Sequence, residues 1–307
     1  MTIAGLILPV FAVIVSGWLA GRLGYISRAL ADGLVHFAYN VAMPALLIVT
    51  IAQEQATKLL EWRFLLAFGG GSMLCFALVF AVVRFAFGRT LASSTVFGMT
   101  AAMTNTGFVA LPVLHAIYGQ PAVLPVAIAT VFVAAVMFPL AVILLEAEAH
   151  GTGKRAGPAA LAKQIVLNPM MLATLAGIAW AISGWHIPAP IAAYLNILAG
   201  ALTPCALFAI GLGLTLDELR ANLKPSVALT VVKLVLMPAV VYGLCVALSL
   251  DRLNTIAAVI CAAVPTAKTI YILAGSYKVE EELVASTVSI TTLLSVVTLM
   301  AWIYGVS

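Results

Sequence analysis

Long apolar runs separated by short polar connections dominate the hydrophobic pattern of this chain. A helix needs ~20 apolar residues to cross the hydrocarbon core of a bilayer. Lipid satisfies no backbone polar group, so each run is predicted to be a transmembrane helix. The predicted fold class is an all-α polytopic membrane protein with ten transmembrane helices. The expected spans are residues 3–21, 30–51, 62–84, 92–116, 122–146, 164–184, 190–216, 226–249, 254–275 and 283–304.

Composition agrees with this pattern and excludes a soluble class. The chain has 307 residues, of which 64% are hydrophobic and 8% are charged. Soluble domains carry about 25% charged residues, and ten spans leave no room for a separate soluble domain. The net charge of +4 does not suggest nucleic-acid binding. No cofactor, metal site or disulfide is expected, because the four cysteines lie in apolar runs without CxxC spacing: Cys75, Cys205, Cys245 and Cys261.

Basic residues are distributed unevenly between the two sets of connections and predict the orientation. Alternate connections carry most of the Lys and Arg residues, whereas the opposite side carries only Lys58, Arg63 and Arg252. By the positive-inside tendency, the basic side is cytoplasmic and both termini are non-cytoplasmic. Four tryptophans fall at the outer ends of spans, where indole rings sit at headgroup level: Trp62, Trp180, Trp185 and Trp302.

The longest connection divides the chain into two sets of five spans. The expected parts are a first five-helix repeat over 1–148, a cytoplasmic connecting loop over 149–163 and a second five-helix repeat over 164–307. An odd number of spans makes the second half enter the membrane from the opposite side. The sequence therefore predicts two inverted repeats.

The fourth and ninth spans carry polar residues and proline near mid-depth. In the fourth span, residues 104–107 read TNTG, and Pro112 is expected to open the hydrogen-bond ladder around Phe108. In the ninth span, residues 265–269 read PTAKT at a similar depth. Both helices are predicted to be broken and to cross near the midplane. The N-terminal ends of their second halves would then point at one spot and attract an anion.

These patterns give a set of candidate site residues. Asn40 joins it because His36, Asn40 and Pro44 share one face of the second span. The substrate-binding candidates are Asn105, Thr106, Gly107, Pro112, Pro265, Thr266, Lys268 and Asn40, with Lys233 and His36 as candidates for coupling or support.

Each candidate also has a simpler interpretation. Asn105 could join two helices by a hydrogen bond, and the prolines could be plain kinks. Two roles fit Lys268, namely snorkelling to the interface or supplying positive charge to the anion site. Lys233 could equally pair with backbone carbonyls, and His36 could be a packed or interfacial histidine. No Asp or Glu is placed at mid-depth, which disfavours coupling through a buried carboxylate pair.

Three sequence segments resemble the auxin efflux carrier family, in its bacterial branch of permeases for malonate and similar organic acids. The resemblance implies crossed, broken helices 4 and 9 in a transport domain, with helices 1, 2, 6 and 7 as a scaffold. It also implies elevator-type alternating access and a homodimer. The segments are NTGFVALP (105–112), VVKLVLMP (231–238) and AAVPTAKTIYILAGSY (262–277).

The expected function is a secondary active transporter of small organic anions, malonate-like mono- or dicarboxylates, with proton or sodium coupling. The alternative is a passive organic-anion channel. A channel with a continuous water-filled pore would need polar residues along several helices, whereas the polar residues here are concentrated at the two breaks. An enzyme is not expected, because neither HExxH nor GxSxG occurs.

Overall fold

The structure is a computed structural model that describes residues 3–27, 29–53, 61–148, 167, 169–212 and 223–306. Every named secondary-structure element in these ranges is a helix or helical turn, as the sequence predicts. Residues group into two compact units: unit 1 comprises 1–62, 106–130 and 164–214, and unit 2 comprises 63–105, 131–163 and 215–307. Both units interleave segments from the two sequence halves, so the boundaries of the five-helix repeats stay a prediction. The connecting loop predicted at 149–163 lies outside the described residues.

Each predicted span contains helix, but the spans differ in length. Six described helices are long and apolar enough to cross a membrane. The predicted fourth and ninth spans are each divided into two shorter helices, because their helical hydrogen bonding is interrupted midway. A count of ten crossings therefore stays a prediction. The six long helices are Gly33–Ile51, Trp62–Ala86, Gln120–Glu148, Ala189–Leu212, Leu223–Ala247 and Glu281–Val306.

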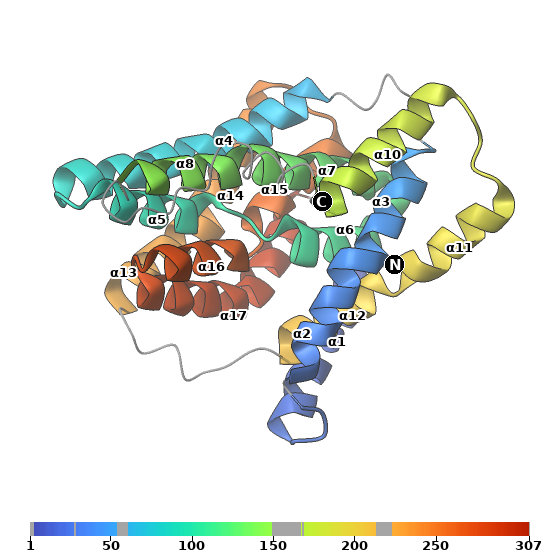
Figure 1. Cartoon of the computed structure of the whole chain (residues 1–307), viewed down its shortest axis with the longest axis horizontal. Coiled ribbons are helices and arrows are strands. Elements are labelled where there is room, and N and C mark those ends of the chain that lie inside the picture. The colour runs from blue at the N-terminus through green and yellow to red at the C-terminus, as the bar shows by residue number, and fades with distance from the viewer. Residues whose placement is uncertain are drawn as a thin grey trace. The chain divides into compact units, whose positions relative to one another are not determined.

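Unit 1 contains the helices of the predicted spans 1, 2, 6 and 7, together with the second half of span 4 and the start of span 5. Its elements in Figure 1 are α1 (Ile3–Arg22), α2 (Ala29–Phe37), η1 (Ala38–Ala42), α3 (Met43–Ile51), η4 (Thr106–Ala110), α6 (Leu111–Tyr118), η5 (Gln120–Ala122), most of α7 (Val123–Phe132), α10 (Pro169–Ser183), α11 (Ala189–Gly200) and α12 (Leu202–Leu212).

The contact between α1 and α12 depends on two glycines. A Cβ atom built on Gly211 would lie 1.9 Å from the carbonyl oxygen of Ile14, and one built on Gly17 would lie 2.2 Å from that of Phe208. Small residues let transmembrane backbones approach closely where lipid supplies no hydrophobic drive between helices. The two glycines therefore set the distance between these two helices.

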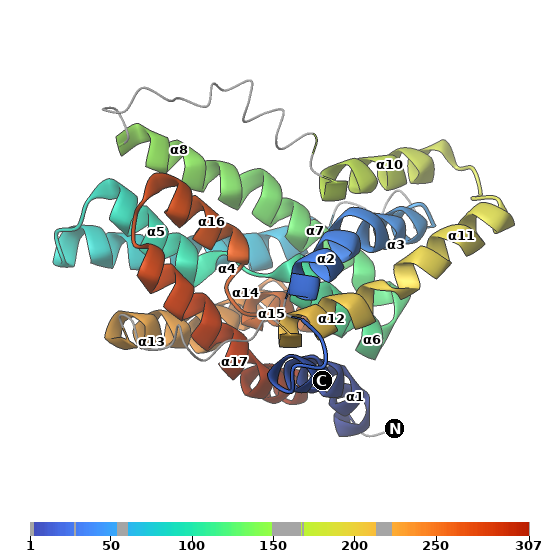
Figure 2. The ribbon, with the colours of Figure 1, turned by 60° about the horizontal axis from the view of Figure 1, so that its bottom comes forward.

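Unit 2 contains spans 3, 8, 9 and 10, the first half of span 4 and the end of span 5. In both views α17 runs beside α13 and α16 (Figures 1 and 2). Its elements are α4 (Trp62–Ala81), η3 (Val82–Ala86), α5 (Leu91–Ala102), η6 (Val133–Met137), α8 (Phe138–Glu148), α13 (Leu223–Val231), η8 (Val232–Leu236), α14 (Met237–Ala247), α15 (Arg252–Ala263), α16 (Lys268–Tyr277) and α17 (Glu281–Val306).

Four prolines inside helical segments follow π-helical turns. Four of the five described π turns, η1, η4, η6 and η8, end two residues before a proline. Proline lacks an N–H and its ring clashes with the carbonyl four residues earlier, and a wider turn relieves that clash. These prolines are therefore accommodated within a continuing helix. They are Pro44, Pro112, Pro139 and Pro238.

We expect Gly211→Ala to destabilise the protein by about 1–3 kcal/mol, the usual cost of overpacking. The added methyl group would collide with the Ile14 backbone, which has no flexible end to move aside. Thermal unfolding in detergent measures the effect. The control is Gly200→Ala, because a Cβ atom at Gly200 meets nothing within 4 Å. Equal melting temperatures for the two variants would contradict the close α1–α12 contact.

Candidate functional site

The first halves of the two broken helices, α5 and α15, are built alike. Each has 12 residues and a side-chain cap at its N-terminus. Thr90 accepts a hydrogen bond from the Ser93 N–H at 3.2 Å, and Asp251 accepts one from the Asn254 N–H at 3.0 Å. Both helices then end in extended backbone, at Met103 and Val264 respectively. The shared construction gives unit 2 two matching helix ends.

The two helix ends pair with each other through their backbones. Thr104 and Thr266 form an isolated antiparallel bridge. The N–H of Asn105 donates to the Pro265 carbonyl at 3.0 Å, and the N–H of Ala267 donates to the Met103 carbonyl at 3.0 Å. In this pattern the bridged residues lie directly opposite, with Cα atoms about 4.5 Å apart. Each break therefore provides hydrogen-bond partners for backbone groups of the other break. In lipid these groups would have no partner.

The break in the fourth span lies upstream of the position that the sequence suggests. Pro112 opens the ladder at the π turn η4, which contains Phe108, and the helix continues from there into α6. The true interruption is at residues 103–105, where the backbone bonds across to Pro265. In the ninth span the interruption lies at Pro265 itself. Pro112 therefore widens a helix that continues, whereas Pro265 lies where the helix is interrupted.

Threonine hydroxyls surround the bridge. Thr266 is 1% exposed; its hydroxyl donates to the Thr100 carbonyl at 2.8 Å, and its N–H donates to the Thr291 hydroxyl at 3.3 Å. The Thr104 hydroxyl is also buried, and it has no hydrogen-bond partner in the described part of the chain. An unpaired buried hydroxyl costs free energy unless water or a ligand bonds to it. The bridge therefore offers an unoccupied hydrogen-bonding group.

The second half of the ninth span begins with a lysine. Lys268 is the first residue of α16 and its side chain is exposed. The preceding N-cap residue, Ala267, provides no side-chain acceptor for the first N–H groups. A helix N-terminus carries about half a positive charge, so an ammonium group there adds to existing positive potential. The start of α16 is consequently an electropositive, uncapped helix end.

Lys233 lies in η8 and is completely buried. Its ammonium group donates to the Ala262 carbonyl at 2.5 Å and contacts the Met237 sulfur at 3.6 Å. Ala262 is in the last turn of α15, where carbonyls lack partners within the helix. A cation at this end also opposes the negative end of the helix dipole. Lys233 thus pairs with a carbonyl, which is one of the two interpretations that the sequence left open, and its part in coupling stays a prediction.

The remaining candidates lie in unit 1. Thr106 is buried and its hydroxyl accepts a hydrogen bond from the Thr130 hydroxyl at 3.0 Å. Asn40 is exposed, and its amide donates to the His36 carbonyl at 2.9 Å. Gly107 lies in η4 and Pro112 is buried near the start of α6. The other candidates, Asn105, Pro265, Thr266, Lys268 and Lys233, belong to unit 2. The part of every candidate in substrate binding stays a prediction.

The sequence reasoning missed the polar face of α17. Thr291 contacts the break directly, and Thr287 and Ser286 on the same helix are fully buried. Thr287, Thr291 and Ser295 recur every four residues within an apolar run. That spacing was the available signal, because it places three hydroxyls on one helix face.

Comparison with known proteins identifies the family. A family model described as "Membrane transport protein" matches residues 2–303. The chain belongs to this family. It is 33% identical over 98% of its length to a protein of Rhizobium meliloti (strain 1021) named "Putative malonate transporter", covering 95% of that protein. It is 27% identical to the uncharacterized transporter YfdV of Escherichia coli (strain K12), over 98% of this chain and 96% of the relative.

The resemblance to auxin efflux carriers is confirmed as a distant relationship. Auxin efflux carrier component 8 of Arabidopsis thaliana is 24% identical over 148 residues, which cover 46% of this chain and 40% of that protein. The family and the apolar helices make this chain a membrane-spanning transporter. The names of the relatives are those of transporters, which favours the prediction that the chain is not an enzyme.

We expect Lys233→Met to loosen the end of α15, because the variant leaves the Ala262 carbonyl unsatisfied at a cost of about 1–3 kcal/mol. Amide hydrogen exchange in residues 258–264, followed by mass spectrometry, should be about tenfold faster than in the wild type. The control is Lys224→Met, which removes an exposed lysine near the start of α13. Unchanged exchange in Lys233→Met would show that the ammonium does not hold this helix end.

Proposed function

We propose that this transporter is a secondary active carrier of small organic anions, malonate-like mono- or dicarboxylates, in the bacterial inner membrane. The supporting observation is the start of α16, where an exposed lysine begins a helix whose N-terminus has no side-chain cap. Among the described residues, no carboxylate forms an ion pair with Lys268; the salt bridge found is between Arg89 and Glu280. Positive potential is thus available at the break without an internal counter-charge.

A carboxylate suits this end of the helix chemically. Its oxygens accept hydrogen bonds from backbone N–H groups at a helix N-terminus and from an ammonium group, and such charge-assisted bonds are stronger than neutral ones. The buried Thr104 hydroxyl, which has no partner among the residues that the structure describes, adds a donor beside Asn105. The proposed binding residues in unit 2 are therefore Asn105, Pro265, Thr266 and Lys268. Asn40, Thr106, Gly107 and Pro112, which belong to unit 1, remain substrate-binding candidates from the sequence alone.

Two observations support the proposed substrate class: the positive charge at the start of α16 and the name of one relative. A single ammonium plus a helix end matches a small carboxylate, and the Rhizobium meliloti relative is named for malonate. Buried carboxylates would favour a cation instead, but no Asp or Glu occurs among the buried residues that the structure describes. Malonate and similar acids are the substrates to test first.

The proposed mechanism is elevator-type alternating access. In it, unit 2, which contains the bridge between the broken helices, carries the anion, and the helices of spans 1, 2, 6 and 7 form the scaffold within unit 1. Ten helices in two inverted repeats, non-cytoplasmic termini, a homodimer and coupling to protons, sodium or the membrane potential belong to the same proposal. The matched construction of α5 and α15 supports the repeat.

Counterflow in proteoliposomes tests this function. Vesicles loaded with unlabelled malonate should accumulate labelled malonate transiently against its concentration gradient, because a carrier exchanges substrate across the membrane one molecule at a time. A passive channel would only equilibrate the label. Imposed proton or sodium gradients, applied separately, then identify the coupling ion.

Lys268→Gln should raise the malonate concentration for half-maximal counterflow about tenfold, because it removes one charge-assisted hydrogen bond. Lys278→Gln is the matched control, since Lys278 is also exposed but follows the C-terminal end of α16. Equal effects of the two substitutions would remove Lys268 from the proposed site. Counterflow by both variants with wild-type affinity would place the anion elsewhere.

A further inference from the structure

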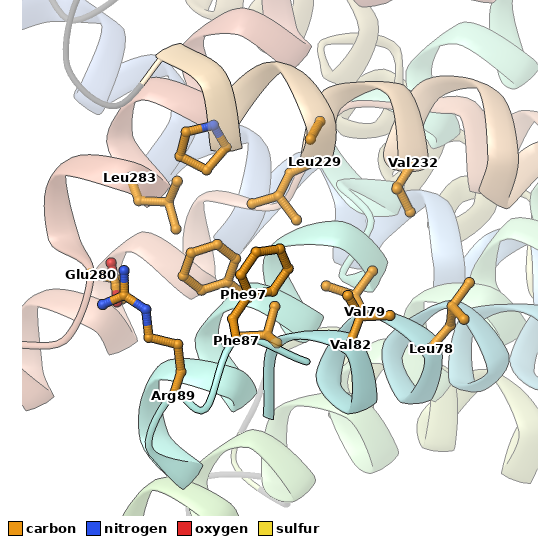
Figure 3. Close-up of a pocket in the computed structure, with 13 residues that line it drawn as sticks. Leu78, Val79, Val82, Phe87, Arg89, Phe97, Leu229, Val232, Glu280 and Leu283 are labelled. Carbon is orange, nitrogen blue, oxygen red and sulfur yellow. The ribbon is translucent and has the colours of Figure 1, made fainter. Parts of the chain in front are cut away.

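Unit 2 contains a cavity that is separate from the bridge between the broken helices. It measures about 470 Å³ and lies between α4 and η3 on one side and α13, η8 and the start of α17 on the other (Figure 3). Sites for small molecules commonly measure about 300–1,000 Å³. The cavity is therefore large enough to hold a ligand.

The cavity walls are almost entirely apolar. Val79, Leu229 and Leu283 form its buried floor, within one hydrophobic cluster. Of the 13 lining residues, Arg89 and Glu280 are the charged ones. A small dicarboxylate would lose its hydration here without replacement, so this cavity does not suit the substrate proposed above.

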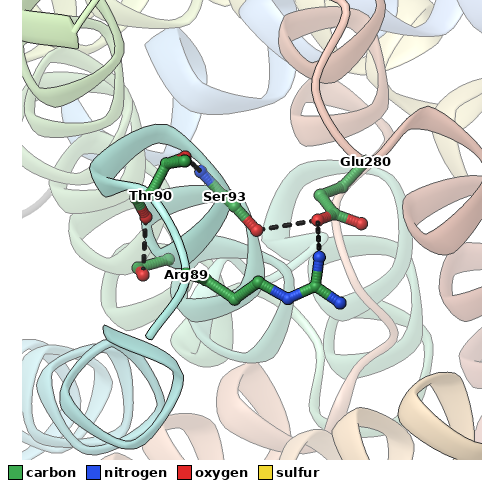
Figure 4. Close-up of polar contacts among 5 residues, drawn as sticks. Arg89, Thr90, Ser93 and Glu280 are labelled. Carbon is green, nitrogen blue, oxygen red and sulfur yellow. Dashed lines mark hydrogen bonds and ion pairs between the residues drawn. The ribbon is translucent and has the colours of Figure 1, made fainter. Parts of the chain in front are cut away.

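The rim of the cavity carries one positive and one negative group side by side. Arg89 and Glu280 lie 3.9 Å apart, with side chains 60% and 24% exposed (Figure 4). The Ser93 hydroxyl donates to Glu280 at 2.7 Å, and the Arg84 guanidinium donates to the Arg89 carbonyl at 2.7 Å. A guanidinium has five N–H donors, so Arg89 retains donors for a further anionic group.

The cavity also opens toward an apolar surface. Leu78, Val82 and Phe87 line it and are themselves exposed, at 51%, 43% and 72%. In a membrane transporter, an exposed apolar face of a long apolar helix such as α4 meets acyl chains. An acyl chain can therefore enter from the side, with its headgroup remaining at the polar rim.

We propose that this cavity binds one acyl chain of a phospholipid whose headgroup carries both a phosphate and a primary ammonium, as in phosphatidylethanolamine. The phosphate lies beside Arg89, and the ammonium donates to Glu280. A rim containing only basic groups would favour anionic lipids, but here a carboxylate accompanies the guanidinium. Phosphatidylcholine fits less well, because its quaternary ammonium has no N–H to donate.

The test uses the purified full-length protein, delipidated in a neutral detergent and titrated separately with three lipids of identical acyl chains: phosphatidylethanolamine, phosphatidylglycerol and phosphatidylcholine. Native mass spectrometry counts the bound lipid. We expect phosphatidylethanolamine to bind at least about fivefold more tightly than the others, and to raise the melting temperature most. Equal binding of all three lipids, or a preference for phosphatidylglycerol, would overturn the proposal.

Variants of the rim and of the cavity separate the two parts of the proposal. Arg89→Gln and Glu280→Gln should each abolish the preference for phosphatidylethanolamine, whereas Ala228→Phe, which fills the cavity, should weaken binding of every lipid. Arg252→Gln is the control for loss of an exposed arginine outside the cavity. Melting without lipid shows that each variant folds. A preference that survives in both rim variants would contradict the assigned headgroup contacts.

Discussion

The structure of unit 2 depends on the backbone pairing between two interrupted helices. A break inside a membrane exposes N–H and C=O groups, each of which costs several kcal/mol if it finds no partner in lipid. Here the bridge between Thr104 and Thr266 lets each break supply partners for the other. Neither interruption would be tolerable alone, so the two breaks stabilise each other and fix the register in which their helices meet.

Side chains also form hydrogen bonds with backbone groups that the bridge itself does not pair. The Lys233 ammonium bonds to the Ala262 carbonyl at the end of α15, and the Thr291 hydroxyl accepts the N–H of Thr266. Pro238 has no N–H to donate to the Leu234 carbonyl four residues earlier, and this carbonyl accepts a hydrogen bond from the Trp302 indole at 2.9 Å instead. Polar groups contributed by η8 and α17 thus hold the break in one conformation, while the start of α16 has no side-chain cap.

The sequence predicted the helical class and the two interruptions, because both follow from local rules: apolar run length, mid-depth polar residues and proline. It placed the opening of the fourth span near Phe108, which the structure shows to be a π turn preceding Pro112. The sequence could not predict which backbone groups pair in the bridge, that Ala262 is the partner of Lys233, or that Thr291 bonds to Thr266. Each of these contacts joins segments far apart in the chain, and hydrophobic periodicity carries no information about which distant backbone groups will meet.

A disulfide between positions 104 and 266 tests the central pairing most directly. Opposed residues of this kind of antiparallel pair lie close enough for a disulfide, which needs Cβ atoms about 3.5–4.5 Å apart. In a background in which the four native cysteines are replaced by alanine, Thr104→Cys with Thr266→Cys should crosslink efficiently on mild oxidation. Thr104→Cys with Thr269→Cys should not, because Thr269 lies three residues beyond the bridge, in the first turn of α16. Failure of the first pair to crosslink, or equal crosslinking of both pairs, would contradict the account.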